Sequence, residues 1–166
     1  MELKNQIFID LEKCYQCKEC TALCNYPLHP QKNGIKILIE EAIRKITCRH
    51  CEDAPCLLSC PNEALKKEGD DIKRASFLCT SCKTCLLACP FGVNTLETVE
   101  FKISFCDLCQ EREAECVKTC PQNAIKVGKF EENVNEDIYK IREGLFVKAV
   151  SWWKQLGTQP KLRIKC

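Results

Sequence analysis

Sixteen of the seventeen cysteines of this chain fall into four groups of four. We number these groups as runs one to four: Cys14, Cys17, Cys20 and Cys24; Cys48, Cys51, Cys56 and Cys60; Cys79, Cys82, Cys85 and Cys89; Cys106, Cys109, Cys116 and Cys120. Runs one and three have the spacing of the bacterial [4Fe–4S] ligand run, and runs two, three and four are each followed by a proline. Sixteen thiolates at four per cluster predict four [4Fe–4S] clusters. Four redox centres in 166 residues indicate a carrier of single electrons.

Two other uses of so many cysteines have to be weighed. A disulfide scaffold is typical of short, cysteine-rich secreted chains. The first residues, however, have no long apolar stretch and no small-residue cleavage site, so we expect a cytoplasmic chain with reduced thiols. Structural zinc is the stronger alternative, but zinc sites usually take two ligand pairs separated by a spacer. Three cysteines at steps of three residues fit a loop around an iron–sulfur cube better.

Composition and charge exclude several other classes. Lys and Arg number 25 and Asp and Glu 23, a formal charge of +2 that four clusters of about −2 each would shift to about −6. The basic residues are dispersed, which argues against nucleic-acid binding. No GxGxxG motif and no nucleophile–base motif is present, so we expect no nucleotide site and no catalytic residues. No stretch approaches the roughly 20 apolar residues of a membrane span.

The elements that position the runs should be short. The pattern predicts strands at 7–10, within 72–78 and at 125–127, and a helical turn around 86–88. Residues 35–45 are ambiguous between strand and helix, and we favour a helix from about Ile37.

The repeat of the runs predicts the organisation of the chain. Residues 43–99, with runs two and three, read as one complete two-cluster unit of the bacterial ferredoxin type. Residues 1–42 and 100–130, with runs one and four, read as a second such unit split open, because run one lacks a closing segment and run four lacks an opening one. The expected fold class is therefore α+β, with short strands and helices around the clusters and one unit inserted in the other.

The third segment, 131–166, is predicted to be a C-terminal amphipathic helix over 131–156 followed by a tail. Its apolar residues recur at steps of three and four: Val134, Ile138, Ile141, Leu145, Ala149, Trp152 and Leu156. Asn133 or Asn135 would cap the start. The helix would cover the ferredoxin body, bind a partner or self-assemble through Trp152 and Trp153, or lie in a membrane interface.

Two further residues have less specific signals. His50 lies between Cys48 and Cys51, and we interpret it as a donor to a cluster sulfur or an exposed ring rather than a ligand. Cys166, the seventeenth cysteine, is interpreted as a free terminal thiol.

With runs spaced in this way, the chain resembles the four-cluster polyferredoxin electron-transfer subunits. Those of similar size are the small subunits of formate hydrogenlyase, hydrogen-dependent carbon dioxide reductase and carbon monoxide dehydrogenase complexes, related to the beta subunit of dimethyl sulfoxide reductase. The segments that carry the resemblance are Cys48-Arg-His-Cys-Glu-Asp-Ala-Pro-Cys-Leu-Leu-Ser-Cys-Pro and the one from Cys106 to Pro121.

The resemblance implies that the last cysteine of each run serves another run's cluster. Cluster one would be held by Cys14, Cys17, Cys20 and Cys120; cluster two by Cys48, Cys51, Cys56 and Cys89; cluster three by Cys79, Cys82, Cys85 and Cys60; and cluster four by Cys106, Cys109, Cys116 and Cys24. Asn25 in place of a proline sets Cys24 apart, and a rival topology pairs run one with two and three with four.

The function expected from this reading is non-catalytic electron transfer. The chain would carry single electrons through four [4Fe–4S] clusters between a catalytic oxidoreductase of the formate dehydrogenase, hydrogenase or carbon monoxide dehydrogenase type and a second redox protein. It would be cytoplasmic, with membrane association only through a complex. The alternatives are a freely diffusing polyferredoxin and a zinc-thiolate structural protein.

Overall fold

The computed structural model describes residues 5–18, 20–26, 33–69, 71–75, 77–93 and 106–150. These residues divide into two compact units: unit one contains those up to Leu38 and those from 106 to 150, and unit two contains those from Ile39 to 93. The boundary falls within α2 (Asn33–Thr47), so the predicted helix in this region is confirmed and begins earlier than expected. Each helix that the structure describes is too short or too polar to span a membrane.

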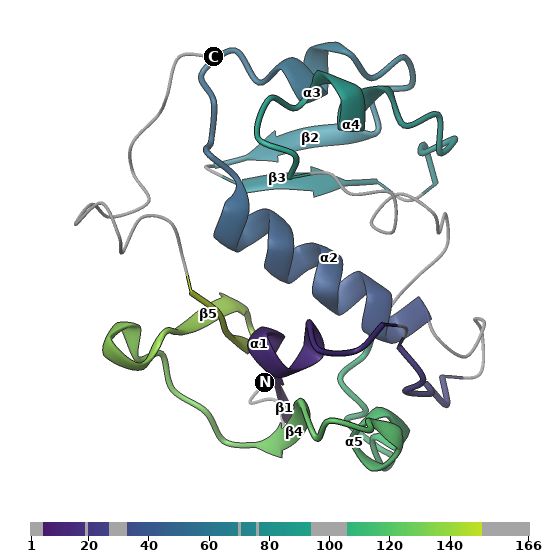
Figure 1. Cartoon of the computed structure of the whole chain (residues 1–166). Helices are drawn as coiled ribbons and strands as arrows, with labels where there is room; N and C mark the ends of the chain where they lie inside the picture. Colours follow the sequence, from purple (N-terminus) through teal and green to yellow (C-terminus); the bar gives the residue numbers. More distant parts are fainter. Residues whose placement is uncertain are drawn as a thin grey trace. The chain divides into compact units, whose positions relative to one another are not determined.

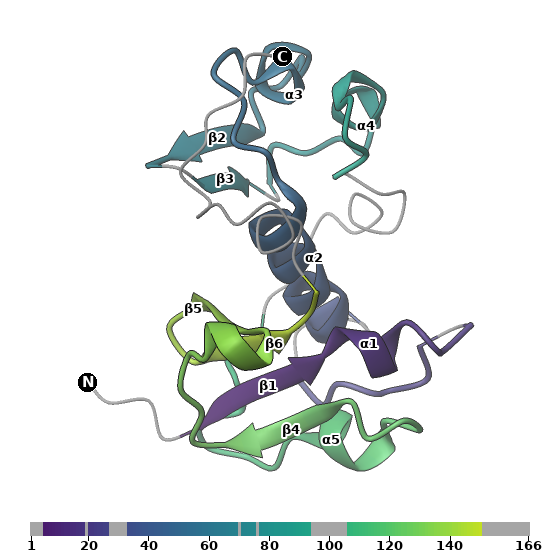
Figure 2. The ribbon, with the colours of Figure 1, turned by 60° about the vertical axis from the view of Figure 1, so that its left-hand side comes forward.

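Unit one is built on a four-stranded sheet of order β4-β1-β6-β5, shown in Figure 2. The strands are β1 (Gln6–Asp10), β4 (Ile125–Gly128), β5 (Ile138–Arg142) and β6 (Leu145–Lys148). β1 pairs with β4 antiparallel and with β6 parallel, and β5 pairs with β6 antiparallel. The predicted strands at 7–10 and 125–127 are therefore confirmed.

The two central strands of this sheet form the core of unit one. Ile7, Ile9, Leu145 and Val147 are fully buried, as expected for β-branched and large apolar residues in strands covered on both faces. Phe130 adds to this core by stacking on the ring of Phe8, with 5.1 Å between the centroids. The core fixes the end of β1, which leads into run one, and the start of β4, which follows run four.

Short helices continue from the strands of unit one. α1 (Leu11–Cys14) follows β1 at once, and the Asp10 side chain caps it by accepting a hydrogen bond from the backbone N–H of Lys13. α5 (Glu115–Thr119) precedes β4 and carries Cys116. Several of the cysteines therefore lie in these short helices or directly beside the strands.

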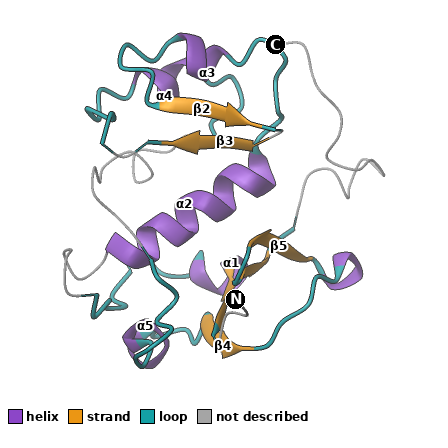
Figure 3. Ribbon diagram, turned by 180° about the vertical axis from the view of Figure 1, so that it is seen from behind, coloured by secondary structure: helices purple, strands orange, loops and turns teal. Residues whose placement is uncertain are grey.

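Unit two contains the hairpin of β2 (Leu65–Glu68) and β3 (Asp71–Arg74), which pair antiparallel. α3 (Pro55–Leu58) lies beside both β2 and α4 (Thr84–Ala88), as Figure 1 and Figure 3 show. The predicted strand within 72–78 and the predicted helical turn around 86–88 are confirmed. β2 follows run two and β3 leads into run three, so this hairpin connects the two runs.

The predicted amphipathic helix over 131–156 is wrong for the described part, residues 131–150. The chain there forms a three-residue 3₁₀ helix, η2 (Val134–Glu136), and then the hairpin of β5 and β6. Gly144 has a φ of +77° and makes the turn between the strands. Asn133 does act as a cap, but of η2, where its side chain accepts a hydrogen bond from Asn135 N.

The error has a physical cause. β6 is a central strand in which Leu145, Phe146 and Val147 are all buried, so it lacks the alternation of a one-sided strand. Its partner β1 lies at the other end of the sequence, beyond the reach of a local pattern. Trp152, Trp153 and Cys166 lie outside the described residues.

Candidate metal centres

Fifteen of the sixteen cysteines in the four runs are thiols outside any disulfide, and Cys51 is disulfide-bonded. In unit two the cysteines gather around two cavities. Cavity A, with about 430 Å³ of space that is partly open to solvent, is lined by Cys48, Cys51, Cys56 and Cys89. Ligation by Cys51 would require that its disulfide first be reduced. Cavity A therefore combines three cysteines of run two with the last cysteine of run three.

Cavity B has the reverse composition. It encloses about 350 Å³, also partly open to solvent, and is lined by Cys60, Cys79, Cys82 and Cys85. Three cysteines of run three here meet the last cysteine of run two. Cys82 is exposed, and hydrogen bonds from Thr84 lower the pKa of its thiol. One of the four cysteines of cavity B therefore lies at the surface of unit two.

In unit one the cysteines of runs one and four influence one another in the same crossed manner. Burial raises the pKa of Cys14 to about 11, and Cys20, Cys17 and Cys120 add to the shift because thiolates repel one another. Cys120, the last cysteine of run four, thus lies in the field of run one.

The second group of unit one is more deeply buried. Burial raises the pKa of Cys106 and Cys116 to about 12, and the charges of Cys109 and Cys24 add to both shifts. The backbone N–H of Leu23 donates to Thr119 Oγ1 at 2.9 Å, so the chain just before Cys24 lies beside the chain just before Cys120. The last cysteine of run one is therefore close to run four.

The backbone around the cysteines repeats from run to run. The residue directly before the second cysteine has a positive φ in three runs: His50, Ser81 and Leu108. The third residue after the last cysteine has one too: Glu63, Gly92 and Asn123. Successive N–H groups in such turns form concavities that bind anions, including iron–sulfur centres.

Several backbone N–H groups already point at sulfur. Ala64 N donates to Cys60 Sγ at 3.3 Å, and Ala124 N donates to Cys120 Sγ at 3.4 Å, at equivalent positions of the repeat. His50 N donates to Cys48 Sγ at 3.4 Å, so this residue acts as a donor through its backbone. His50 is only 6% exposed, and the alternative of an exposed ring is wrong.

Two buried polar atoms provide a test of whether the cavities suit a cluster. Among the described residues, Ser81 Oγ is buried with no hydrogen-bond partner, and Arg44 Nη2 is buried with an ion pair to Glu40 Oε1 at 3.0 Å. Ser81 lines cavity B and Arg44 lines cavity A. A ligand with sulfur acceptors would satisfy the Ser81 hydroxyl, whose burial without a partner costs about 1–3 kcal/mol, and would accept the second N–H of Arg44 Nη2. The donor set therefore fits an iron–sulfur cluster.

A single metal ion fits less well. In the part of the chain that the structure describes, no group of three or more His, Cys, Asp or Glu side chains has an arrangement that could hold one metal ion. Four thiolates on one tetrahedral zinc would lie about 4 Å apart, because each Zn–S bond is about 2.3 Å long. The thiols instead surround a space, which suits a ligand larger than one ion.

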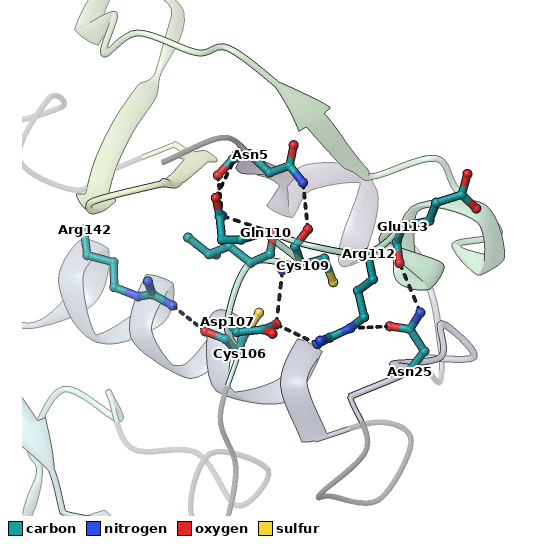
Figure 4. A network of polar contacts seen from close by, with 10 residues as sticks. Asn5, Asn25, Cys106, Asp107, Cys109, Gln110, Arg112, Glu113 and Arg142 are labelled. Carbon is teal, nitrogen blue, oxygen red and sulfur yellow. Dashed lines mark hydrogen bonds and ion pairs between the residues drawn. The ribbon is translucent and has the colours of Figure 1, made fainter. Parts of the chain in front are cut away.

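The longer spacing in run four supplies a polar network that fixes this run in unit one (Figure 4). Asn5 Nδ2 donates to the carbonyl of Cys109 at 2.7 Å, and Gln110 Nε2 donates to the carbonyl of Asn5 at 2.9 Å. Arg142 Nη2 reaches the carbonyl of Cys106 at 3.4 Å. The segment before β1 and the strand β5 thereby hold the loop that carries the first two cysteines of run four.

Arg112 and Asn25 connect this loop to run one. Arg112 Nη2 lies 2.7 Å from Asp107 Oδ1, and Arg112 Nε donates to Asn25 Oδ1 at 3.2 Å. Asn25 Nδ2 in turn donates to the carbonyl of Glu113 at 3.1 Å. Asn25, which stands where the other runs have a proline, therefore anchors the chain beside Cys24 to run four.

Sequence reasoning missed the buried charges of unit two. Glu40 and Arg44 on α2 are 4% and 8% exposed, and Arg44 Nε donates a hydrogen bond to Glu40 Oε1 in the interior of the unit. Their spacing of four residues is a weak signal that also occurs on exposed helix faces. The partner of Glu40 on β3, Arg74, is 34 residues away, and no local pattern indicates that pair.

Comparison with known proteins gives a consistent result. Residues 39–130 match the model of a family described as 4Fe-4S dicluster domain. The "Putative electron transport protein YsaA" of Escherichia coli (strain K12) is 33% identical over 136 residues, which are 72% of this chain and 87% of that protein. The "Electron transport protein HydN" of the same organism is 28% identical over 148 residues, 72% of this chain and 85% of that protein.

A third relative is much larger. The "Putative oxidoreductase AegA" of Escherichia coli (strain K12) is 33% identical over 142 residues, which are 73% of this chain and 21% of that protein. The chain therefore spans about a fifth of the length of this relative.

Proposed function

Because the chain belongs to the family of 4Fe-4S dicluster domain proteins, we propose that it is an electron-transfer subunit with four [4Fe–4S] clusters, two in each unit. The observation that carries the proposal is the crossed composition of cavities A and B. Each cavity combines three cysteines of one run with the last cysteine of the other. This is the arrangement of two-cluster ferredoxins, in which the fourth cysteine of a run ligates the other cluster.

The ligands follow from this arrangement. Unit two would hold one cluster by Cys48, Cys51, Cys56 and Cys89, and one by Cys79, Cys82, Cys85 and Cys60. Unit one would hold one by Cys14, Cys17, Cys20 and Cys120, and one by Cys106, Cys109, Cys116 and Cys24. The crossed influence of Cys120 on Cys14, and of Cys24 on Cys106 and Cys116, supports the second pair. The rival pairing of run one with two and run three with four finds no support in these contacts.

When bound, such a cluster takes up or releases one electron. The cysteine thiolates would hold it, and the N–H groups of Ala64, Ala124 and His50 would donate to the ligand sulfurs and thereby tune the reduction potential. The raised thiol pKa values mean that the protein gives up protons when the thiols ligate metal. The exposed corner at Cys82 would let a partner approach closely enough to exchange electrons.

The partners belong to the proposal as well. We infer a catalytic oxidoreductase on one side and a second redox protein on the other, in a cytoplasmic complex. The size of AegA supports this, because a segment like this chain is there part of a larger protein named as an oxidoreductase. Leu58 and Leu87, on α3 and α4, are more than three-quarters exposed and offer an apolar contact surface in unit two. A role for Trp152 and Trp153 in docking stays a prediction from the sequence.

A pair of ligand variants tests the crossed arrangement. Cys60→Ala should remove the cluster that run three holds, and Cys89→Ala the cluster that run two holds. Electron paramagnetic resonance of the reduced, anaerobically purified variants, compared with wild type, resolves which signal is lost. Loss of the run-two signal in Cys60→Ala would show that each run ligates its own cluster. Copurification from the source cell then separates a complex subunit from a freely diffusing ferredoxin.

A further inference from the structure

Three charged side chains lie buried together in unit two. Glu40 Oε1 accepts hydrogen bonds from Arg44 Nε at 3.2 Å and from Arg74 Nε at 2.7 Å, and Glu40 Oε2 accepts one from Arg74 Nη2 at 2.5 Å. Each of the three side chains is less than a tenth exposed. We call this group the Arg–Glu–Arg triad. With two guanidiniums and one carboxylate it carries a net charge of +1 in the protein interior.

Each arginine of the triad reaches a different cavity. Arg44 lines cavity A, with Cys48 and Cys56, and Arg74 lines cavity B, with Cys60 and Cys79. Glu40 raises the pKa of Arg74 against the effect of burial, and Cys79 raises it further. The triad is therefore a single bonded group whose two positive ends stand at the two candidate cluster sites.

The positive charge of Arg44 acts on cysteine thiols of both cavities. Burial raises the pKa of Cys48, Cys56 and Cys85, and in each case the charge of Arg44 acts in the opposite direction. Cys48 and Cys56 belong to cavity A, whereas Cys85 belongs to cavity B. A cation that favours the thiolates in both places also favours added negative charge in both places.

The internal repeat shows that the fold itself does not require this charge. In unit two Leu65 pairs with Arg74 across the hairpin, and in unit one the equivalent pair is Ile125 with Ile9. Arg74 stands five residues before Cys79, as Ile9 stands five residues before Cys14. Ile9 is fully buried, so an apolar side chain fills the same position in the other unit. Buried ion pairs add little stability over apolar packing, which makes a purely structural role a poor explanation.

We propose that the Arg–Glu–Arg triad raises the reduction potentials of both cluster sites of unit two, an inference that rests on the proposed function. One electron from a reductant changes the charge of a site from about −2 to about −3, and no proton has to follow. A guanidinium held at the cavity wall stabilises the added charge, and Glu40 keeps both guanidiniums in place while reducing their net effect. Unit one has Ile9 at the position of Arg74, so the triad makes the site at cavity B unlike the equivalent candidate site with Cys14.

Redox titration of the full, anaerobically purified chain with dithionite, followed by electron paramagnetic resonance, tests the proposal. Arg74→Met should lower the reduction potential of the site at cavity B by about 59 mV, which corresponds to a tenfold change in the one-electron equilibrium constant. Glu40→Gln should shift the potentials of both unit-two sites upward, because it removes a negative charge. The double variant should return the cavity B site toward its wild-type value.

Lys73→Met is the matched control. Lys73 is next to Arg74 on β3 and pairs with Glu68, but its side chain is 65% exposed and water screens its charge. This variant should leave all potentials unchanged. Arg74→Lys keeps the charge without the bidentate fork and should retain most of the wild-type potential.

Three results would overturn the proposal. The potentials could be unchanged in both single variants with the clusters retained, or they could shift in the same direction in both. The clusters could also be lost in both Glu40→Gln and Arg74→Lys, which would make the triad an element of folding. Failure of the proposed function gives a different result, because wild type itself would then contain no iron–sulfur clusters.

Discussion

The contact between Asn25 and Arg112 predicts how firmly Cys24, the proposed remote ligand of the fourth cluster, is held. We consider two variants, Asn25→Ala and Arg112→Ala. Asn25→Ala removes two hydrogen bonds between run one and run four, at 3.1 and 3.2 Å. Arg112→Ala removes the second of these, the ion pair with Asp107 and the contact with the Tyr26 ring, whose centroid lies 5.1 Å from the guanidinium carbon.

The magnitude follows from these contacts. Each hydrogen bond contributes about 0.5–1.5 kcal/mol net, and the exposure of Asn25 favours the lower half of that range. Asn25→Ala should therefore cost about 1–2 kcal/mol, which corresponds to roughly a 5–30-fold faster separation of Cys24 from run four. Arg112→Ala should cost about 2–3 kcal/mol, because the partly exposed ion pair and the ring contact add to the lost hydrogen bond.

The assay is anaerobic iron release to a chelator. In Asn25→Ala about one quarter of the iron, one cluster in four, should leave in a faster phase, while the rest leaves at the wild-type rate. Gln122→Ala is the matched control: Gln122 is an exposed amide two residues after Cys120, and no side-chain hydrogen bond from it occurs in the described part. Uniform release in Asn25→Ala, or acceleration equal to that of the control, would refute the reasoning.

Three further predictions concern acid, the core and metal removal. As the pH falls, protons compete with iron for the thiolates. The site with Cys106 and Cys116, whose pKa values are raised to about 12, should therefore lose iron at a higher pH than the site with Cys82, whose pKa is lowered. Iron content after dialysis to successive pH values checks this order. Leu145→Ala should destabilise unit one by roughly 2–5 kcal/mol, seen as a lower thermal midpoint in circular dichroism, whereas Val150→Ala, at a 57% exposed position, should have little effect. Removal of all iron by a chelator should abolish the near-ultraviolet signal of folded packing, because small metal domains depend on their ligands for folding, and an unchanged spectrum would contradict this.

Much of the structure near the cysteines could be predicted from the sequence, because the signals there are local. The strand β1 follows from the run Ile7-Phe8-Ile9, whose β-branched and aromatic residues favour a buried strand. The division of the sixteen cysteines into four runs follows from their spacing alone. The positive φ values at Ser81 and Leu108, by contrast, occur at residues with little intrinsic preference for them, and the turns around the cysteines impose them.

What could not be predicted depends on contacts between distant parts of the chain. The hairpin of β5 and β6 was mistaken for a helix because its position in the sheet depends on the parallel pairing of Leu145 with Ile7. The ion pair of Glu40 with Arg74 and the anchoring of Asn25 likewise join residues that only the fold brings together. At both places a polar residue departs from the pattern of its repeat, and this departure was the available signal.

The most direct test of the account is the metal and sulfide content of the anaerobically purified chain, together with its Mössbauer spectrum. Four cubes on sixteen cysteines predict about sixteen iron and about sixteen sulfide per chain, with the spectrum of [4Fe–4S] centres throughout. A content of about four metal ions per chain, mostly zinc and without sulfide, would contradict the account.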